Sequence, residues 1–222
     1  MSAIIRSQND DIEIPTWVND LTSFRHWIDT NELPEKLPVH FIDGEVWMDC
    51  EMEEFFSHNC IKTALGIALA SFIADQDLGT YVSDGMRYTN EDVGFSTEPD
   101  AMYFSHETYE RGDVEFQSGR KGKATELVGT PDLVIEIISP STEEKDTDWL
   151  KRNYYQAGIP EYWLIDARPE EPLFGIWKRT EIGYRETQSI DGWQSSNVLG
   201  QSIRLTRKLN RLSIATYRME MR

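Results

Sequence analysis

The chain has 222 residues, of which 39% are hydrophobic and 11% aromatic. That is enough for one well-packed α/β core and short for two, so a single domain over residues 1–222 is expected. The formal net charge of −17 argues against a protein that holds nucleic acid through a broad basic surface, because clustered Lys and Arg normally supply phosphate affinity. The alternative, that the acidity only secures solubility, stays open.

The charge is unevenly distributed along the chain. Acidic residues concentrate before residue 175. The C-terminal part carries a series of basic residues, namely Lys178, Arg179, Arg185, Arg204, Arg207, Lys208, Arg211 and Arg218. A site that requires a cation also repels nucleic acid until the metal binds, so the formal charge overstates the repulsion.

Targeting signals are not apparent in the sequence. The N-terminus lacks an apolar stretch typical of a signal peptide, and no run approaches the roughly 18 apolar residues of a membrane helix. Cys50 and Cys60 are therefore expected to be reduced packing residues rather than a disulfide or a metal pair. We expect a cytoplasmic protein with no membrane segment.

Residues 1–37 are predicted to form a helical extension, because Trp17, Leu21, Phe24 and Ile28 recur at helical spacing. The next segment alternates around Asp43-Gly44, a dipeptide typical of a type I′ turn, and is predicted to be a hairpin.

Ser57 is a plausible N-cap for a core helix. In that helix the apolar residues recur every three or four positions, as Ile61, Ala64, Leu65, Ala68, Leu69, Phe72 and Ile73. Strands are predicted at 80–88 and 100–104, with a polar loop between them. Residues 105–129, rich in charge and glycine, are expected to form a helical turn and a mobile insertion.

The run LVIEII at 133–138 is apolar on both faces and predicts a buried central strand. A helix over 143–157 and a strand over 161–166 complete a βαβ-sized unit. Residues 168–222 are predicted to be β-rich, with antiparallel edge strands. The apolar face of the second helix carries Leu150, Tyr154 and Ala157.

Glu136 lies within the apolar run, where an unpaired carboxylate would be costly to bury. Asp132 points to the same face but lies about 13 Å away at ~3.3 Å per residue, too far to share one cation. Asp100 is the natural partner, because Pro99 suits a strand entrance and carboxylates on adjacent strands can lie about 5 Å apart. The carbonyl of Ile137 could supply a third oxygen to Mg²⁺. Alternatively, Glu136 pairs with an arginine or lysine and has no catalytic role.

The stretches PDLVIEIISPST and AGIPEYWLID, together with IDGEVWM and STEPD, resemble the Uma-type ("Uma-two") restriction endonuclease family of the PD-(D/E)XK superfamily. The resemblance spans residues 38–180. It implies a restriction-endonuclease-like α/β core, in which a central mixed β-sheet is flanked by helices and extended by antiparallel edge strands. It also implies that Asp100 and Glu136 are metal ligands, with a lysine moved from the strand to the following helix.

The sequence departs from the family pattern at the lysine. Ile138 occupies the strand position of the E-x-K motif, and Leu150 stands where many relatives carry the helical lysine. Lys145 and Lys151 flank that position. The tripeptide Lys145-Asp146-Thr147 resembles one found in a branch of the family, and this resemblance favours Lys145. His58 matches a family histidine, although a structural role is the alternative. Glu45 is a candidate accessory ligand, although a hairpin Glu is commonly just exposed.

These observations predict a hydrolase: a metal-dependent endonuclease that cleaves DNA phosphodiester bonds with Mg²⁺, for which Mn²⁺ can substitute. The alternative is a catalytically inactive nuclease-fold protein that binds DNA or a protein partner, as the missing strand lysine and the acidity suggest. A sugar or nucleotide hydrolase ranks last, because the sequence has no glycine-rich phosphate loop. Cutting both strands usually takes two active sites, so a homodimer is expected.

Overall fold

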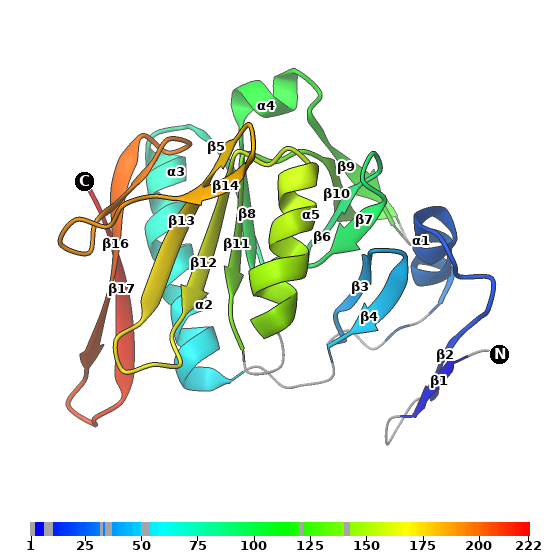
Figure 1. Ribbon diagram of the computed structural model, residues 1–222, viewed down its shortest axis with the longest axis horizontal. Helices are drawn as coiled ribbons and strands as arrows, with labels where there is room; N and C mark the ends of the chain where they lie inside the picture. Colours follow the sequence, from blue (N-terminus) through cyan, green and yellow to red (C-terminus); the bar gives the residue numbers. More distant parts are fainter. Residues whose placement is uncertain are drawn as a thin grey trace.

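The computed structural model describes residues 3–6, 11–31, 33, 37–49, 54–119, 122–139 and 143–222 (Figure 1). A central sheet runs in the strand order β14-β13-β12-β11-β8-β5. Its strands are β5 (Gly79–Ser83), β8 (Ala101–Ser105), β11 (Leu133–Ile137), β12 (Glu161–Asp166), β13 (Leu173–Thr180) and β14 (Gly183–Glu186). β11 is parallel to β12, and the other pairs of this sheet are antiparallel. The mixed α/β architecture predicted from the sequence is confirmed.

β11 lies between β8 and β12 and is buried along its whole length, as its apolar run predicted. The chain between β11 and β12 forms a π-helical turn, η4 (Lys145–Leu150), that continues into α5 (Lys151–Gln156). Leu150 and Tyr154 on this helix are buried against Val134 and Tyr162 of the two strands. The predicted strand, helix and strand unit is therefore confirmed.

A long helical segment covers the other face of the central sheet (Figure 1). It runs through η1 (Phe55–Asn59), α2 (Cys60–Leu65), η2 (Gly66–Ala70) and α3 (Ser71–Asp75). Its buried residues Ile61, Leu65 and Leu69 share a core with Ile135 and Trp163. The apolar spacing predicted this helix correctly. The prediction of Ser57 as its N-cap was wrong, because the side chain of Glu54 caps the helix by accepting from the Ser57 N–H.

A small C-terminal sheet packs on the same core as this helical segment. Its strands, in the order β15-β16-β17, are β15 (Gln194–Ser196), β16 (Gln201–Leu209) and β17 (Ala215–Met221). Ile203 and Met219 are buried in the shared core. The buried carboxylate of Glu161, at the start of β12, accepts hydrogen bonds from the Ser196 hydroxyl and the Asn197 N–H. This carboxylate joins the C-terminal sheet to the central sheet.

A second, peripheral sheet lies beyond α5 and runs in the order β4-β3-β7-β6-β10-β9 (Figure 1). Its strands are β3 (Val39–Ile42), β4 (Glu45–Met48), β6 (Arg87–Asn90), β7 (Phe95–Thr97), β9 (Val114–Ser118) and β10 (Ala124–Gly129). Tyr88 and Phe95 contact Tyr154 of α5, so this sheet and the central sheet enclose one core. Asp43 and Gly44 both have positive φ, which confirms the predicted hairpin turn.

The N-terminal region contains the predicted helix, with Phe24 and Ile28 buried, but it also contains a strand pair that was not predicted. An antiparallel pair, β1 (Ala3–Arg6) and β2 (Asp11–Ile14), precedes α1 (Leu21–Thr30). The Asp20 side chain caps the helix, so the helix starts after Trp17. Trp17 is 47% exposed.

Three further predictions were wrong. The strand predicted at 80–88 divides between the two sheets as β5 and β6, with Gly85 at positive φ in the bend between them. Residues 105–129 contain α4 (His106–Glu110), as the predicted helical turn, but continue as the paired strands β9 and β10 instead of an insertion. The polar loop before Asp100 also contains β7.

Among the described residues, no helix is long and apolar enough to span a membrane. Cys60 is a free thiol, and Cys50 lies outside the described residues.

Candidate active site

Asp100 and Glu136 lie beside each other at the end of two neighbouring strands. β8 and β11 are antiparallel with Ala101 opposite Ile135, so the next positions in register are Asp100 and Glu136. The Asp100 carboxylate turns back onto β11, where its Oδ2 accepts a 2.7 Å hydrogen bond from the N–H of Ile137. The structure thus brings three predicted residues together: Asp100, Glu136 and Ile137.

The helix on one side of the sheet adds a histidine and a lysine. The Nε2 of His58 lies 3.1 Å from the carbonyl oxygen of Ile137 and 3.5 Å from Oδ2 of Asp100. The Nζ of Lys62 lies 3.0 Å from Oδ1 of Asp100 and 2.9 Å from Oδ2 of Asp84. Lys62 was not predicted from the sequence, although it follows His58 by four positions and therefore shares its helix face.

These contacts set the protonation of Asp100. Burial raises the pKa of its carboxyl, but the hydrogen bond and charge of His58 and the ammonium of Lys62 outweigh burial and hold the pKa below its ordinary value. Asp100 is therefore a carboxylate at neutral pH.

Glu136 lies in the opposite electrostatic situation. It is buried, and the Tyr154 hydroxyl of α5 donates a hydrogen bond to its Oε1. Burial, reinforced by the nearby carboxyls of Asp146 and Asp100, raises the pKa of Glu136 well above its ordinary value. Lys145 and the Tyr154 hydrogen bond oppose this rise. The ionised form of Glu136 is therefore destabilised unless a cation lies nearby.

The two candidate lysines occupy different places. The Nζ of Lys145 lies 3.8 Å from Oδ1 of the buried Asp146, and its charge acts on Glu136. Lys151 instead lies over the ring of Trp177 on β13, with Nζ 3.0 Å from the ring centre, and burial lowers its pKa. The structure brings Lys145 into the cluster and leaves Lys151 outside it.

Glu45 is not part of the cluster. It is exposed at the start of β4, next to the hairpin turn. The turn itself is tied to α5, because Arg152 and Asn153 both bond the carboxylate of Asp43.

A buried histidine and a glutamate extend the cluster toward the peripheral sheet. The Nδ1 of His40, on β3, lies 2.9 Å from the hydroxyl oxygen of Thr97, at hydrogen-bond distance. Burial, followed by the charges of Lys145 and Arg87, lowers the pKa of His40 well below its usual range, so it is neutral. Burial also raises the pKa of Glu98. Neither residue was predicted, because their proximity to Lys145 depends on pairing between distant strands.

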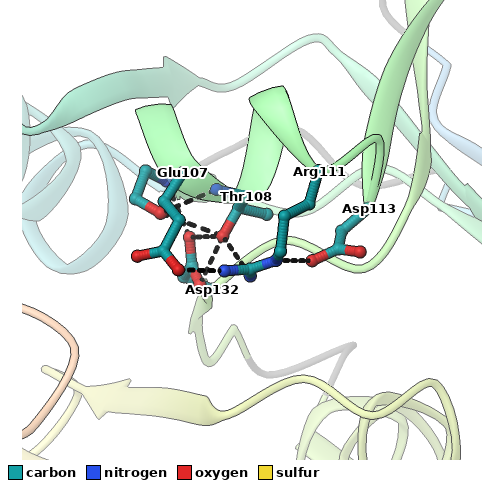
Figure 2. A network of polar contacts seen from close by, with 6 residues as sticks. Glu107, Thr108, Arg111, Asp113 and Asp132 are labelled. Carbon is teal, nitrogen blue, oxygen red and sulfur yellow. Dashed lines mark hydrogen bonds and ion pairs between the residues drawn. The ribbon is translucent and has the colours of Figure 1, made fainter.

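Asp132, the second Pro-Asp aspartate, has a structural role at the opposite end of β11 (Figure 2). Its carboxylate accepts hydrogen bonds from the Ser105 N–H, at 2.7 Å, and from the Thr108 hydroxyl at the start of α4. Figure 2 shows Arg111 spanning from Glu107 to Asp113 beside this contact. Asp132 therefore holds α4 against the sheet and takes no part in the cluster around Glu136.

The oxygen atoms of the cluster are of the kind that a hard divalent cation accepts. Asp100 and Glu136 supply carboxylates and Ile137 a carbonyl, while Asp146 adds a further negative charge. No group of three or more His, Cys, Asp or Glu side chains in the described part of the chain is arranged to hold a metal ion. This donor set fits Mg²⁺, which commonly keeps several waters and uses one or two carboxylates.

The fold and this carboxylate cluster define a nuclease-like α/β protein. A family model described as "Uma2: Putative restriction endonuclease" matches residues 23–216. The chain belongs to this family, as its sequence motifs predicted. The fold is also similar to the crystal structure of a putative nuclease belonging to DUF820 from Anabaena variabilis, with a TM-score of 0.61 and 17% sequence identity; the match covers 82% of this chain and 90% of that chain. At this identity the likeness concerns the fold. No curated protein matches the sequence significantly.

Proposed function

We propose that this protein is a Mg²⁺-dependent endonuclease that hydrolyses phosphodiester bonds in DNA. One observation carries the proposal: Asp100 and Glu136 lie opposite each other on neighbouring strands, the Asp100 carboxylate is bonded to the Ile137 N–H, and the charge of Lys145 acts on Glu136. The pKa of Asp100 is lowered and that of Glu136 is raised. Membership of a family described as restriction endonucleases supports the same reaction class.

Each residue has a defined task in this proposal. Asp100, Glu136 and the Ile137 carbonyl would hold the cation, and a bound Mg²⁺ would lower the pKa of a water for attack on phosphorus. The His58 imidazole and the Ile137 N–H fix the orientation of Asp100. Tyr154 fixes Glu136 through its hydroxyl.

Lys145 supplies the positive charge that the strand position Ile138 lacks. Its ammonium would orient the attacking water and offset the charge that builds on the phosphate. Its place on η4, at the start of the helix that carries Tyr154, ties it to the element that also positions Glu136.

A second candidate function is that of an inactive nuclease-fold protein that binds DNA or a protein partner. The contact of Lys62 with Asp100 favours it, because an ammonium already lies 3.0 Å from the oxygen that would face a cation. Ligation by Asp100 through Oδ1 therefore requires the Lys62 ammonium to move away from this oxygen, and the Asp84 carboxylate already bonds that ammonium at 2.9 Å.

Plasmid nicking in Mg²⁺ or Mn²⁺, with EDTA as the blank, distinguishes the two functions. We expect metal-dependent cleavage that is lost in the Asp100→Asn, Glu136→Gln double variant. The same metals should raise the melting temperature of the parent protein but not that of the double variant, because compensation of the buried carboxylates is the source of the rise.

A matched control removes two exposed carboxylates elsewhere, as Glu110→Gln, Glu181→Gln, and should keep both cleavage and the thermal shift. Cleavage that survives in the Asp100, Glu136 double variant would rule out this site. A parent protein that binds DNA but does not cleave it with either metal would favour the second function.

A further inference from the structure

The C-terminal sheet carries the opposite charge to the rest of the molecule. Residues 194–222, which contain this sheet, have six Lys and Arg against one Glu, although the whole chain has a net charge of −17. Positive charge is thus concentrated on a small part of a strongly acidic protein.

The register of β16 and β17 divides their side chains between two faces. Ile203 and Leu205 share one face with Met219, which is buried in the core. The outward face carries three cations, two hydroxyls and one carboxylate: Arg204, Thr206, Lys208, Thr216, Arg218 and Glu220. We refer to these six residues as the basic face. Lys208, Thr216 and Arg218 are exposed, with 77% of the Arg218 side chain accessible.

An aromatic ring extends the basic face toward β15. The guanidinium carbons of Arg204 and Arg222 lie 4.5 Å and 4.1 Å from the centre of the Trp193 ring. Glu220 accepts a hydrogen bond from Arg204 and lies 4.0 Å from the Nε of Arg218. Arg204 is therefore held in position between Trp193 and Glu220, while Lys208 and Arg218 are exposed beside it.

The turn-side end of the basic face lies at the same end of the central sheet as the candidate active site. The Tyr217 hydroxyl is 3.5 Å from the carbonyl of Ala167, and Arg207 donates to the carbonyl of Glu170 at 3.0 Å. Both carbonyls follow β12, whose residue Ile165 pairs with Ile137 of the site. β17 also packs beside α2, the helix that carries Lys62.

We propose that the basic face is the docking surface for the DNA backbone that leads to the active site. This inference rests on the proposed function, because it assigns the substrate contact of the same site. From Arg204 to Lys208 the strand spans about 13 Å, which is the axial length of about four phosphates of one DNA strand. Guanidinium, ammonium and threonine hydroxyl groups are the donors that commonly bind phosphate oxygens.

The positive charge of the basic face is complementary to the negative charge of a polyanion. The rest of the molecule repels phosphate, so affinity must come from a local cationic surface. The contacts would carry no sequence preference, because they reach phosphates rather than base edges.

The test is the salt dependence of binding to a fluorescent DNA duplex in EDTA, measured in the Asp100→Asn, Glu136→Gln background, where neither cleavage nor the negative charge of the metal-free site interferes. We expect the Lys208→Gln, Arg218→Gln variant to bind at least about tenfold more weakly and to lower the slope of log affinity against log salt by about 2. The Lys123→Gln, Arg185→Gln variant makes the same change in net charge at exposed positions outside the C-terminal sheet and should bind as the parent does.

Equal weakening in both variants would attribute the effect to overall charge and overturn the proposal. Unchanged binding in the Lys208, Arg218 variant, or a parent protein that binds no DNA or prefers an RNA duplex, would also overturn it. A protein that docks DNA as expected but does not cleave it would refute the nuclease proposal and leave the docking surface standing. In an active protein, the variant should raise KM and retain kcat.

Discussion

The hydroxyl of Tyr154 donates a hydrogen bond to Oε1 of Glu136, and both side chains are buried. The bond crosses from α5 to the central strand β11, so the helix that follows the candidate metal site also holds one of its carboxyls. Tyr154 is thus a positioning residue for Glu136.

We expect Tyr154→Phe to raise the pKa of Glu136 further, because the hydrogen bond lowers it. Metal-dependent cleavage should then require a higher pH, and the free energy of unfolding should fall by about 1–2 kcal/mol, since a buried acceptor loses its donor. The pH profile of single-turnover cleavage measures the first effect. Tyr155→Phe is the control, because its hydroxyl bonds only the Thr180 and Glu181 carbonyls. An unshifted profile in Tyr154→Phe would refute the positioning role.

The raised pKa of Glu136 has a consequence for stability in the metal-free protein. A carboxyl whose folded-state pKa is raised stabilises the fold fully below its unfolded pKa, about 4.3, and this stability is lost as the pH rises through the folded value. Across that window the loss is about 1.4 kcal/mol for each pH unit. Glu136→Gln should remove this part of the pH dependence.

Urea unfolding in EDTA at a series of pH values measures the effect. The free energy of unfolding of the variant should rise relative to that of the parent as the pH increases from the unfolded pKa through the raised folded pKa of Glu136. Asp100→Asn should behave in the opposite way, because the pKa of Asp100 is lowered. The loss of unfolding free energy in Asp100→Asn should be greatest at neutral pH and should become smaller as the pH falls through the folded pKa of Asp100. Parallel pH curves for the parent and Glu136→Gln would contradict the electrostatics of the buried site.

The two lysines of the helix after β11 should differ sharply in function. Lys145→Met is expected to slow single-turnover cleavage at saturating Mg²⁺ by about a hundredfold, because it removes the ammonium that acts on the site. Lys151→Met should keep the rate and lose only its contact with Trp177, at a cost of about 0.5–1 kcal/mol in unfolding free energy. Parental rates in both variants would show that neither lysine serves the reaction, and an equal loss in both would refute the distinction between them.

The two Pro-Asp aspartates provide a further comparison. Asp132→Asn should lower the free energy of unfolding by about 1–3 kcal/mol, because the Ser105 N–H and the Thr108 hydroxyl lose a charged acceptor. The Mg²⁺-induced thermal shift should remain. Asp100→Asn should instead weaken that shift, and a lost shift in Asp132→Asn would mean that the helix α4 contributes to the metal site.

Strong apolar patterns made the centre of the fold predictable. The run at 133–138 is buried as expected, and so are Ile61, Leu65, Leu69 and Ile73 of the predicted helix. Strand geometry made Asp100 the candidate partner of Glu136, the family resemblance implied the same pair, and the register places the two residues opposite each other. The edge strands β9 and β10 escaped prediction because exposed strands rich in charge and glycine lack an apolar repeat.

The remaining site residues depend on tertiary contacts that have no local signature. Lys62 reaches Asp100 from a helix on the far face of the sheet, and His40 comes from a strand of the peripheral sheet. The sequence spacing between His58 and Lys62 contains the one local hint, because a helix places the two side chains on one face.

The separation of charge between the basic face and the rest of the chain makes the molecule an electric dipole. In the field of a polyanion such a molecule turns before it makes contact, with its C-terminal sheet leading and its acidic remainder trailing. In most random encounters with a duplex, the electrostatic torque would therefore reorient the protein, or repulsion would separate the two molecules, before any direct contact forms. The overall negative charge, which by itself argues against nucleic-acid binding, would then determine the direction from which the protein approaches DNA.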